Sequence, residues 1–144
     1  MTFKHILAAT DFSDCSARAL DLAIELAGQL DAQLTLVHTW EIPSLGYGAA
    51  MYFPGDVLTP IENAARAQLE EVTNAVKKRV PRANSVLRVG AAWDEIIAAA
   101  ASVHADLIVL GTHGRRGVSR ALLGSVAERV VRLSPVAVLT VRGT

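Results

Sequence analysis

Short apolar runs alternate along the chain with longer stretches in which apolar residues recur every three or four positions. The short runs are continuous and rich in β-branched residues, which is typical of strands buried on both faces of a sheet. These expected strands are residues 4–10, 33–40, 85–89, 107–110 and 136–141. The longer stretches have the period of amphipathic helices. These expected helices are residues 16–30, 59–80, 94–103 and 125–133.

The alternation of five strands with four helices predicts an α/β fold, an open, doubly wound, five-stranded parallel sheet with helices on both faces. No linker or repeat divides the sequence, so residues 1–144 are expected to form one domain. The one long irregular stretch, residues 41–58, mixes glycine and proline with aromatic residues. Its length and aromatic content favour a lid or a partner surface.

Two of the expected helices begin with a capping sequence. Ser125 and Glu128 have the spacing of a capping box, with the serine at N-cap and the glutamate at N3. Thr59 and Glu62 repeat this spacing with a proline between them at N1. We therefore expect Ser125 and Thr59 to be N-cap residues.

A glycine-rich loop separates the fourth expected strand from the last helix. Gly111 and Gly114 follow the strand, and nine residues later Gly124 and Ser125 precede the helix. Glycine allows positive φ and lets a ligand approach the backbone, while free N–H groups at a helix start attract phosphate. The spacing differs from GxxxxGK[ST] and from GxGxxG. It favours a phosphate site, and the alternative is a set of turn glycines without a ligand.

Composition narrows the classes of partner. Fourteen basic and fourteen acidic residues give a formal net charge of zero, which argues against general binding to nucleic acid or membrane surfaces. No apolar stretch approaches the length of a membrane helix. The single cysteine, Cys15, and the absence of a signal-peptide pattern lead us to expect a cytoplasmic protein.

Across its whole length the chain resembles the universal stress protein family, in its ATP-binding branch. The resemblance rests on the glycine motif together with residues 9–13, 37–39, Gly90 and 134–141. It implies a Rossmann-like sheet of order 3-2-1-4-5, in which the ends of strands one and four meet at one crevice. Ligands of open parallel sheets bind at such a reversal of strand order.

The resemblance also implies an ATP site, with Mg²⁺ as the accompanying ion. The residues expected to bind the nucleotide are Ala9, Thr10, Asp11, Thr39, Gly111, Gly114, Arg115, Gly124, Ser125 and Val126. A carboxylate accepts hydrogen bonds from sugar hydroxyls and repels phosphate, so Asp11 fits the ribose end; its alternative role is to cap the neighbouring turn. Trp40 and Trp93 are expected near the pocket rim.

The sequence offers few groups for catalysis. The four histidines have no metal-ligand spacing, no GxSxG elbow occurs, and no residue is an obvious Walker-B acid or catalytic base. For His113, inside the glycine loop, contact with phosphate and plain solvent exposure are both open. We expect no catalytic residues and no protein metal site, and at most slow ATP hydrolysis.

The leading hypothesis is a nucleotide-responsive regulatory module of stress responses, in which ATP stabilises one conformation. The apolar strand 136–141 would be an exposed edge, so a homodimer through this strand is expected, as the resemblance also implies. One alternative is a nucleotide-free protein of the same fold that binds a protein or apolar partner through residues 41–58. Another is an enzyme acting on an adenine nucleotide.

Overall fold

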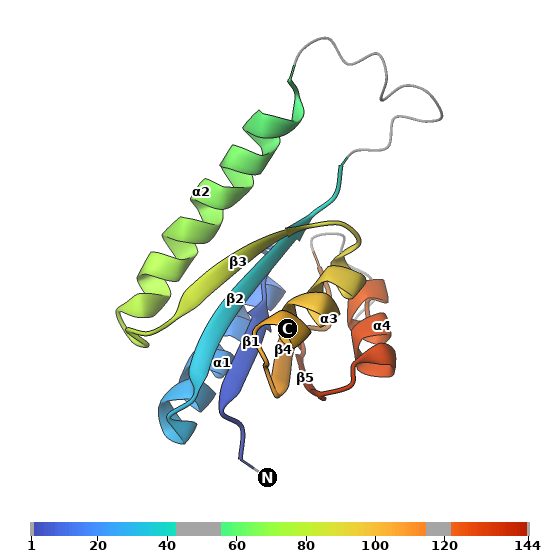
Figure 1. Ribbon diagram of the computed structural model, residues 1–144. Helices are drawn as coiled ribbons and strands as arrows, with labels where there is room; N and C mark the ends of the chain where they lie inside the picture. The colour runs from blue at the N-terminus through green and yellow to red at the C-terminus, as the bar shows by residue number, and fades with distance from the viewer. Residues whose placement is uncertain (1, 43–55, 115–121, 144) are drawn as a thin grey trace.

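The computed structural model describes residues 2–42, 56–114 and 122–143. Its strands form one parallel sheet in the order β3-β2-β1-β4-β5, so the expected fold class and strand order are confirmed. The strands are β1 (His5–Ala9), β2 (Gln33–Trp40), β3 (Asn84–Val89), β4 (Leu107–Gly111) and β5 (Ala137–Val141). The order reverses between β1 and β4, which lie side by side at the centre (Figure 1).

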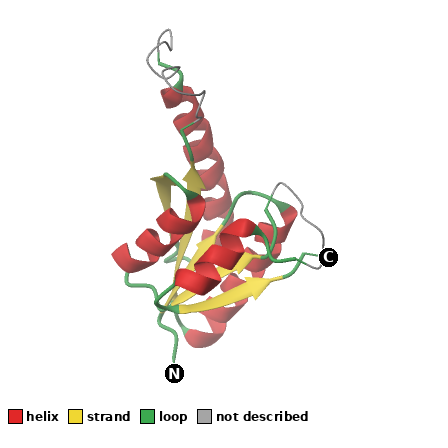
Figure 2. Ribbon diagram, turned by 90° about the vertical axis from the view of Figure 1, so that its right-hand side faces the viewer, coloured by secondary structure: helices red, strands yellow, loops and turns green. Residues whose placement is uncertain are grey.

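Helices cover both faces of this sheet (Figures 1 and 2). The helices are α1 (Asp14–Leu30), α2 (Leu58–Lys77), α3 (Ala92–Ser102) and α4 (Ser125–Leu133). Side chains of α1 and α2 share one buried cluster with Ile6 and Leu36, and those of α3 and α4 share the other with Leu7 and Val37. Strand side chains alternate between faces, so β1 and β2 feed both clusters. None of the described helices has the length and apolar character needed to cross a membrane.

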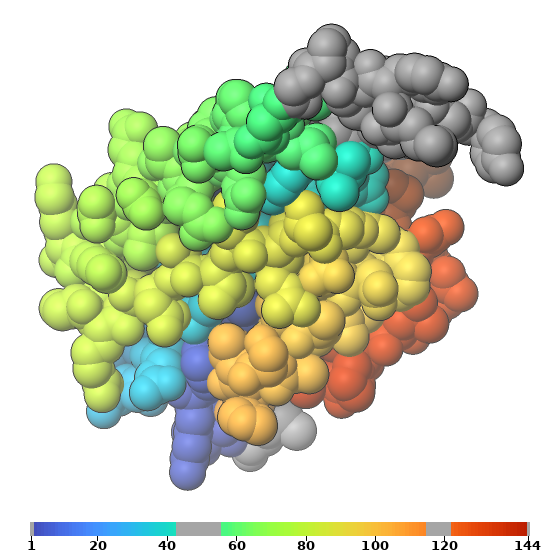
Figure 3. All heavy atoms as spheres, turned by 45° about the horizontal axis from the view of Figure 1, so that its top comes forward, coloured from blue at the N-terminus to red at the C-terminus, as the bar shows by residue number. Residues whose placement is uncertain are grey.

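The first half of α2 extends beyond the sheet. The expected apolar stripe reaches the core only from Leu69 onward, whereas Ile61 is 40% exposed. In the space-filling view the first turns of α2, in green, lie beside the end of β2, in cyan, at one end of the molecule (Figure 3). The expectation of one core-facing stripe along the whole helix is therefore wrong for its first turns, because they extend past the ends of β2 and β3 (Figure 1).

The cap expected for α2 is also wrong. The helix begins at Leu58 with Val57 at N-cap, and Oδ1 of Asp56 accepts hydrogen bonds from the backbone N–H groups of Leu58 and Thr59 at 3.2 and 3.0 Å. A hydrogen bond from the Thr59 side chain, followed by the one from its backbone, lowers the pKa of Asp56. A carboxylate at the positive end of a helix is a strong acceptor. Thr59 therefore donates hydrogen bonds to Asp56 and does not act as the N-cap.

The N-cap of the last helix lies one residue earlier than its capping box predicts. Gly124 is the N-cap, in extended conformation, and its N–H donates to the Thr112 carbonyl at 2.7 Å. Ser125 is the first helical residue, and Glu128 pairs with Arg132 at 2.8 Å. The loop is tied back to β4 at Gly124, and this bond fixes where the helix begins.

Candidate functional site

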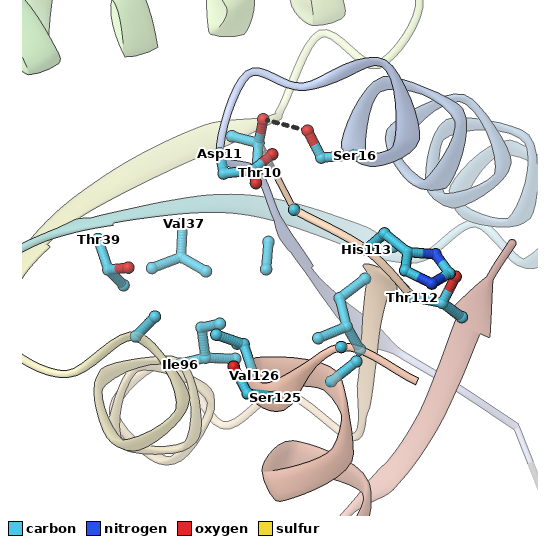
Figure 4. Close-up of a pocket in the computed structure, with 17 residues that line it drawn as sticks. Thr10, Asp11, Ser16, Val37, Thr39, Ile96, Thr112, His113, Ser125 and Val126 are labelled. Carbon is cyan, nitrogen blue, oxygen red and sulfur yellow. Dashed lines mark hydrogen bonds between the residues drawn. The ribbon is translucent and has the colours of Figure 1, made fainter. Parts of the chain in front are cut away.

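A pocket of about 270 Å³ lies at the carboxyl ends of β1, β2 and β4, where the strand order reverses (Figure 4). Its walls also include the first residues of α3 and α4. This is the place at which open parallel sheets bind their ligands. The strand order thus brings together segments that are about a hundred residues apart in the sequence.

Nine of the ten residues expected at the site line this pocket. They are Ala9, Thr10, Asp11, Thr39, Gly111, Gly114, Gly124, Ser125 and Val126. Arg115 lies outside the described residues, as do Arg116 and residues 43–55 of the irregular stretch. Trp40 and Trp93 do not line the pocket. The Trp93 ring instead packs under the Arg129 guanidinium, 5.4 Å from the ring centroid, and so links α3 to α4.

Sequence reasoning missed part of the lining. Ala92 and Ile96 of α3 belong to it, and so do Thr112 and Ser16. The α3 residues carry no polar signature, and they reach the pocket only because the connection after β3 crosses back over the sheet. The sequence could have indicated this position, because the connection from β3 through α3 to β4 is expected to be right-handed, and this decides which face of the sheet α3 covers.

One end of the pocket is apolar. Val37 and Ile96 are 1% and 4% exposed and approach it from β2 and α3, with Ala92 and Thr39 beside them. In Figure 4 Val37, Thr39 and Ile96 lie together on one side of the cavity. An apolar slot with one hydroxyl suits a flat ring that carries a few polar atoms.

Another wall of the pocket is the start of α4, at Ser125 and Val126. The first helical hydrogen bond runs from the Glu128 N–H to the Gly124 carbonyl at 2.9 Å, so the N–H groups of Ser125, Val126 and Ala127 precede it. Such N–H groups and the positive end of the helix dipole attract an anion. The exposed Ser125 side chain adds a hydroxyl at the same place.

Gly124 is needed for close approach. A Cβ built on it would lie 2.7 Å from the Thr112 carbonyl oxygen, which belongs to backbone and cannot swing away. At Gly114 a Cβ would lie 2.7 Å from Oδ2 of Asp11. Neither glycine uses the positive φ that glycine allows; among the described glycines Gly90 has a positive φ.

Asp11 supplies the carboxylate of the pocket lining. Its Oδ1 accepts hydrogen bonds from the backbone N–H and the hydroxyl of Ser13, so the turn-capping role is present in the structure. Its Oδ2 faces Gly114. In Figure 4 Asp11 and Ser125 come from opposite sides of the pocket. A ligand anion at Ser125 is therefore kept apart from the carboxylate, which favours a neutral hydrogen-bonding group near Asp11.

Metal-binding side chains are sparse. Among the described residues no three His, Cys, Asp or Glu side chains form a group that could hold a metal ion. Asp11 is the one carboxylate in the pocket lining, and His113 lies beside Thr112 with Nδ1 3.0 Å from its hydroxyl. The protein alone therefore offers a divalent ion at most one carboxylate in the described part of this pocket.

Comparison with known proteins agrees with this architecture. The model of the universal stress protein family matches residues 2–142. Universal stress protein A homolog 1 of Coxiella burnetii is 37% identical over 143 residues, which cover 98% of this chain and 97% of that protein.

Solved structures show the same fold. Universal stress protein UspA from Lactobacillus plantarum superposes with a TM-score of 0.83 at 24% identity, over 99% of each chain. A universal stress protein solved in complex with cAMP has a TM-score of 0.72 at 28% identity, over 100% of each chain. The family match over almost the whole chain shows that this protein belongs to the universal stress protein family.

Proposed function

We propose that this chain is an adenine-nucleotide-binding regulatory module whose ligand is ATP. The observation that carries the proposal is that one pocket combines an apolar slot, a carboxylate and a helix start. A nucleotide presents a group that suits each of these parts, namely a flat base, sugar hydroxyls and phosphates. The relative solved with cAMP supports an adenine nucleotide as the class of ligand.

Each part of the pocket has a role in this proposal. The base lies between Val37 and Ile96, near the hydroxyl of Thr39. Asp11 accepts hydrogen bonds from the ribose, and the N–H groups that start at Ser125 hold the phosphates. Mg²⁺ keeps several waters and is held largely by phosphate oxygens, so a pocket with a single carboxylate suits a nucleotide-bound ion.

Binding, with at most slow hydrolysis, is the expected activity. Phosphoryl transfer to water needs a group that positions or activates the attacking water. In the described lining the ionisable candidates are Asp11 and His113, and Asp11 is engaged by Ser13. ATP then acts by favouring the conformation that it binds best, and the change in population is limited by its difference in affinity between states.

The test is calorimetric titration of nucleotide-stripped protein with ATP and magnesium, with AMP, cAMP and GTP as comparisons. We expect saturable binding of one ATP per chain. Gly124→Val should abolish it, because the new side chain would meet the Thr112 carbonyl at the phosphate wall. Gly28→Ala is the matched control, since a Cβ there meets no atom within 4 Å. Unchanged affinity in a folded Gly124→Val protein would contradict the phosphate assignment.

A further inference from the structure

His38 lies directly behind the pocket. It stands in β2 between Val37 and Thr39, which both line the pocket, while His38 does not. Because side chains alternate along a strand, His38 points to the opposite face of the sheet, the face covered by α1 and α2. Its imidazole can therefore affect a ligand only through the residues that it touches.

The first residue that it touches is Thr10. Nδ1 of His38 lies 2.8 Å from the Thr10 backbone carbonyl oxygen. A carbonyl oxygen can only accept, so Nδ1 carries the proton and donates. The Thr10 N–H in turn donates to the Val37 carbonyl at 2.9 Å. Both backbone groups of Thr10 are thus held by β2, and this fixes the plane of the peptide that leads into Asp11.

The second residue is Phe12. Its φ is 65°, in the left-handed region that bulky residues rarely adopt. The Phe12 and His38 rings lie 4.3 Å apart between centroids, tilted by 40°, and Phe12 packs against the α1 and α2 side of the core. The Phe12 N–H donates to the Thr10 hydroxyl at 3.0 Å. Strained backbone of this kind persists only where its surroundings hold it.

Asp11 is the residue between these two. Its backbone neighbours are both in contact with His38, and its carboxylate faces the pocket at Gly114. We infer that His38 is a positioning residue: from behind the sheet it holds the strained turn that aims the Asp11 carboxylate into the pocket. The effect on ligand binding rests on the function proposed above, whereas the effect on the turn does not.

Two substitutions separate the hydrogen bond from the bulk of the ring. His38→Asn keeps an N–H donor near the position of Nδ1, and His38→Leu keeps apolar volume without a donor. Loss of the His38 donor leaves the carbonyl of buried Thr10 unsatisfied, so we expect His38→Leu to weaken ATP binding about tenfold. We expect His38→Asn to stay within about threefold of wild type.

Leu87→Ala is the matched control for general loss of packing. Leu87 pairs with His38 in the register of β2 and β3, packs on the same face, and lies one strand farther from Thr10. It should lower the urea midpoint while leaving ATP affinity unchanged. Equal losses of affinity in Leu87→Ala and His38→Leu would overturn the inference, because a packing defect alone would then explain both.

A double-mutant cycle tests whether His38 acts through Asp11. If it does, His38→Leu should have almost no further effect on affinity once Asp11→Ala is present. Additive losses would overturn the inference. Nonadditive loss in this pair, together with rescue by His38→Asn, is the result that we expect.

Amide hydrogen exchange of the ligand-free protein provides a test that does not depend on the nucleotide. The N–H groups of Phe12 and Ser13 are bonded within the turn, so their exchange should speed up about tenfold in His38→Leu and little in His38→Asn or Leu87→Ala. Unchanged exchange would overturn the inference even if ATP binds. Absence of ATP binding by the wild type would overturn the proposed function and leave this result to decide the role of His38.

Discussion

At the scale of single residues, His5 links the fold to pH at the end of the sheet opposite the pocket. Its Nε2 lies 2.8 Å from the hydroxyl of Thr35, which donates to Oδ1 of Asn84 at 2.6 Å. These three side chains join β1, β2 and β3. Since the Thr35 proton is given to Asn84, Nε2 of His5 must donate. Burial is the main cause that lowers the pKa of His5 from 6.5, against opposing effects of Asp106 and the Val103 backbone.

This direction predicts a loss of stability in mild acid. The pKa of His5 is lower in the folded protein than in the unfolded chain, so in mild acid the unfolded chain binds more protons. The contribution of His5 to the free energy of unfolding is therefore complete only above the unfolded pKa. It is lost as the pH falls from about 6.5 through the folded pKa. His5→Gln keeps a donor for Thr35 and does not titrate, and should therefore flatten this part of the curve of urea midpoint against pH.

The control is His104→Asn, which removes an exposed histidine whose φ of 57° asparagine tolerates. Its curve should keep most of the loss in mild acid, because the charge of His104 is the smallest of the effects on the pKa of His5. A His5→Gln protein that loses as much stability in mild acid as the wild type would show that another group is responsible.

At the scale of elements, an ion pair places the start of α3 at the pocket. Nε of Arg88 in β3 lies 2.8 Å from Oε2 of Glu95, and the two side chains are 34% and 21% exposed. The turn between them passes through Gly90, whose φ is 141°, with the Glu95 side chain packed over it. Glu95 precedes Ile96, which forms the apolar slot. The pair therefore fixes one wall of the pocket.

We expect the ion pair of Arg88 and Glu95 to stabilise the fold more than an ordinary surface ion pair does. A cycle of Arg88→Met and Glu95→Gln should give a coupling of about 1 kcal/mol in the free energy of unfolding, the upper end for partly exposed pairs. The matched control is Arg66 and Glu62 in the first half of α2, 53% and 44% exposed, where about 0.3 kcal/mol is expected. Equal couplings would remove the special role of the α3 pair.

Elements differ in how far the sequence predicts them. The bounds of β2 and α4 match the expected 33–40 and 125–133, because a turn around Asp31 precedes β2, and Gly124 and Pro135 flank α4. The caps do not match, since Asp56 accepts from the N–H groups of Leu58 and Thr59, and Gly124 occupies the N-cap position expected for Ser125. Residues at strand ends in the pocket were predictable from the strand order. The role of His38 was not predictable, because this residue is in β2 and contacts the turn that follows β1.

At the scale of the whole molecule, the sheet has two edges of different kinds. β3 lies under α2, while β5 pairs with β4 alone among the described strands. The residues of β5 are exposed or half-buried, and the neighbouring α4 exposes Val131 and Leu133, 48% and 46%. An apolar edge strand with free backbone groups invites pairing with another chain.

We propose that two copies of the chain associate through β5, in the strand expected at residues 136–141. The Val141 carbonyl accepts from the Thr112 N–H on the β4 side, so alternate residues such as Thr140 direct their backbone groups outward. Thr140→Pro removes an outward N–H and should convert a dimer into a monomer in sizing with light scattering. Thr140→Val keeps that N–H and should stay dimeric. A monodisperse wild-type monomer at micromolar concentration would refute pairing through β5, and a dimer unaffected by the proline would move the interface elsewhere.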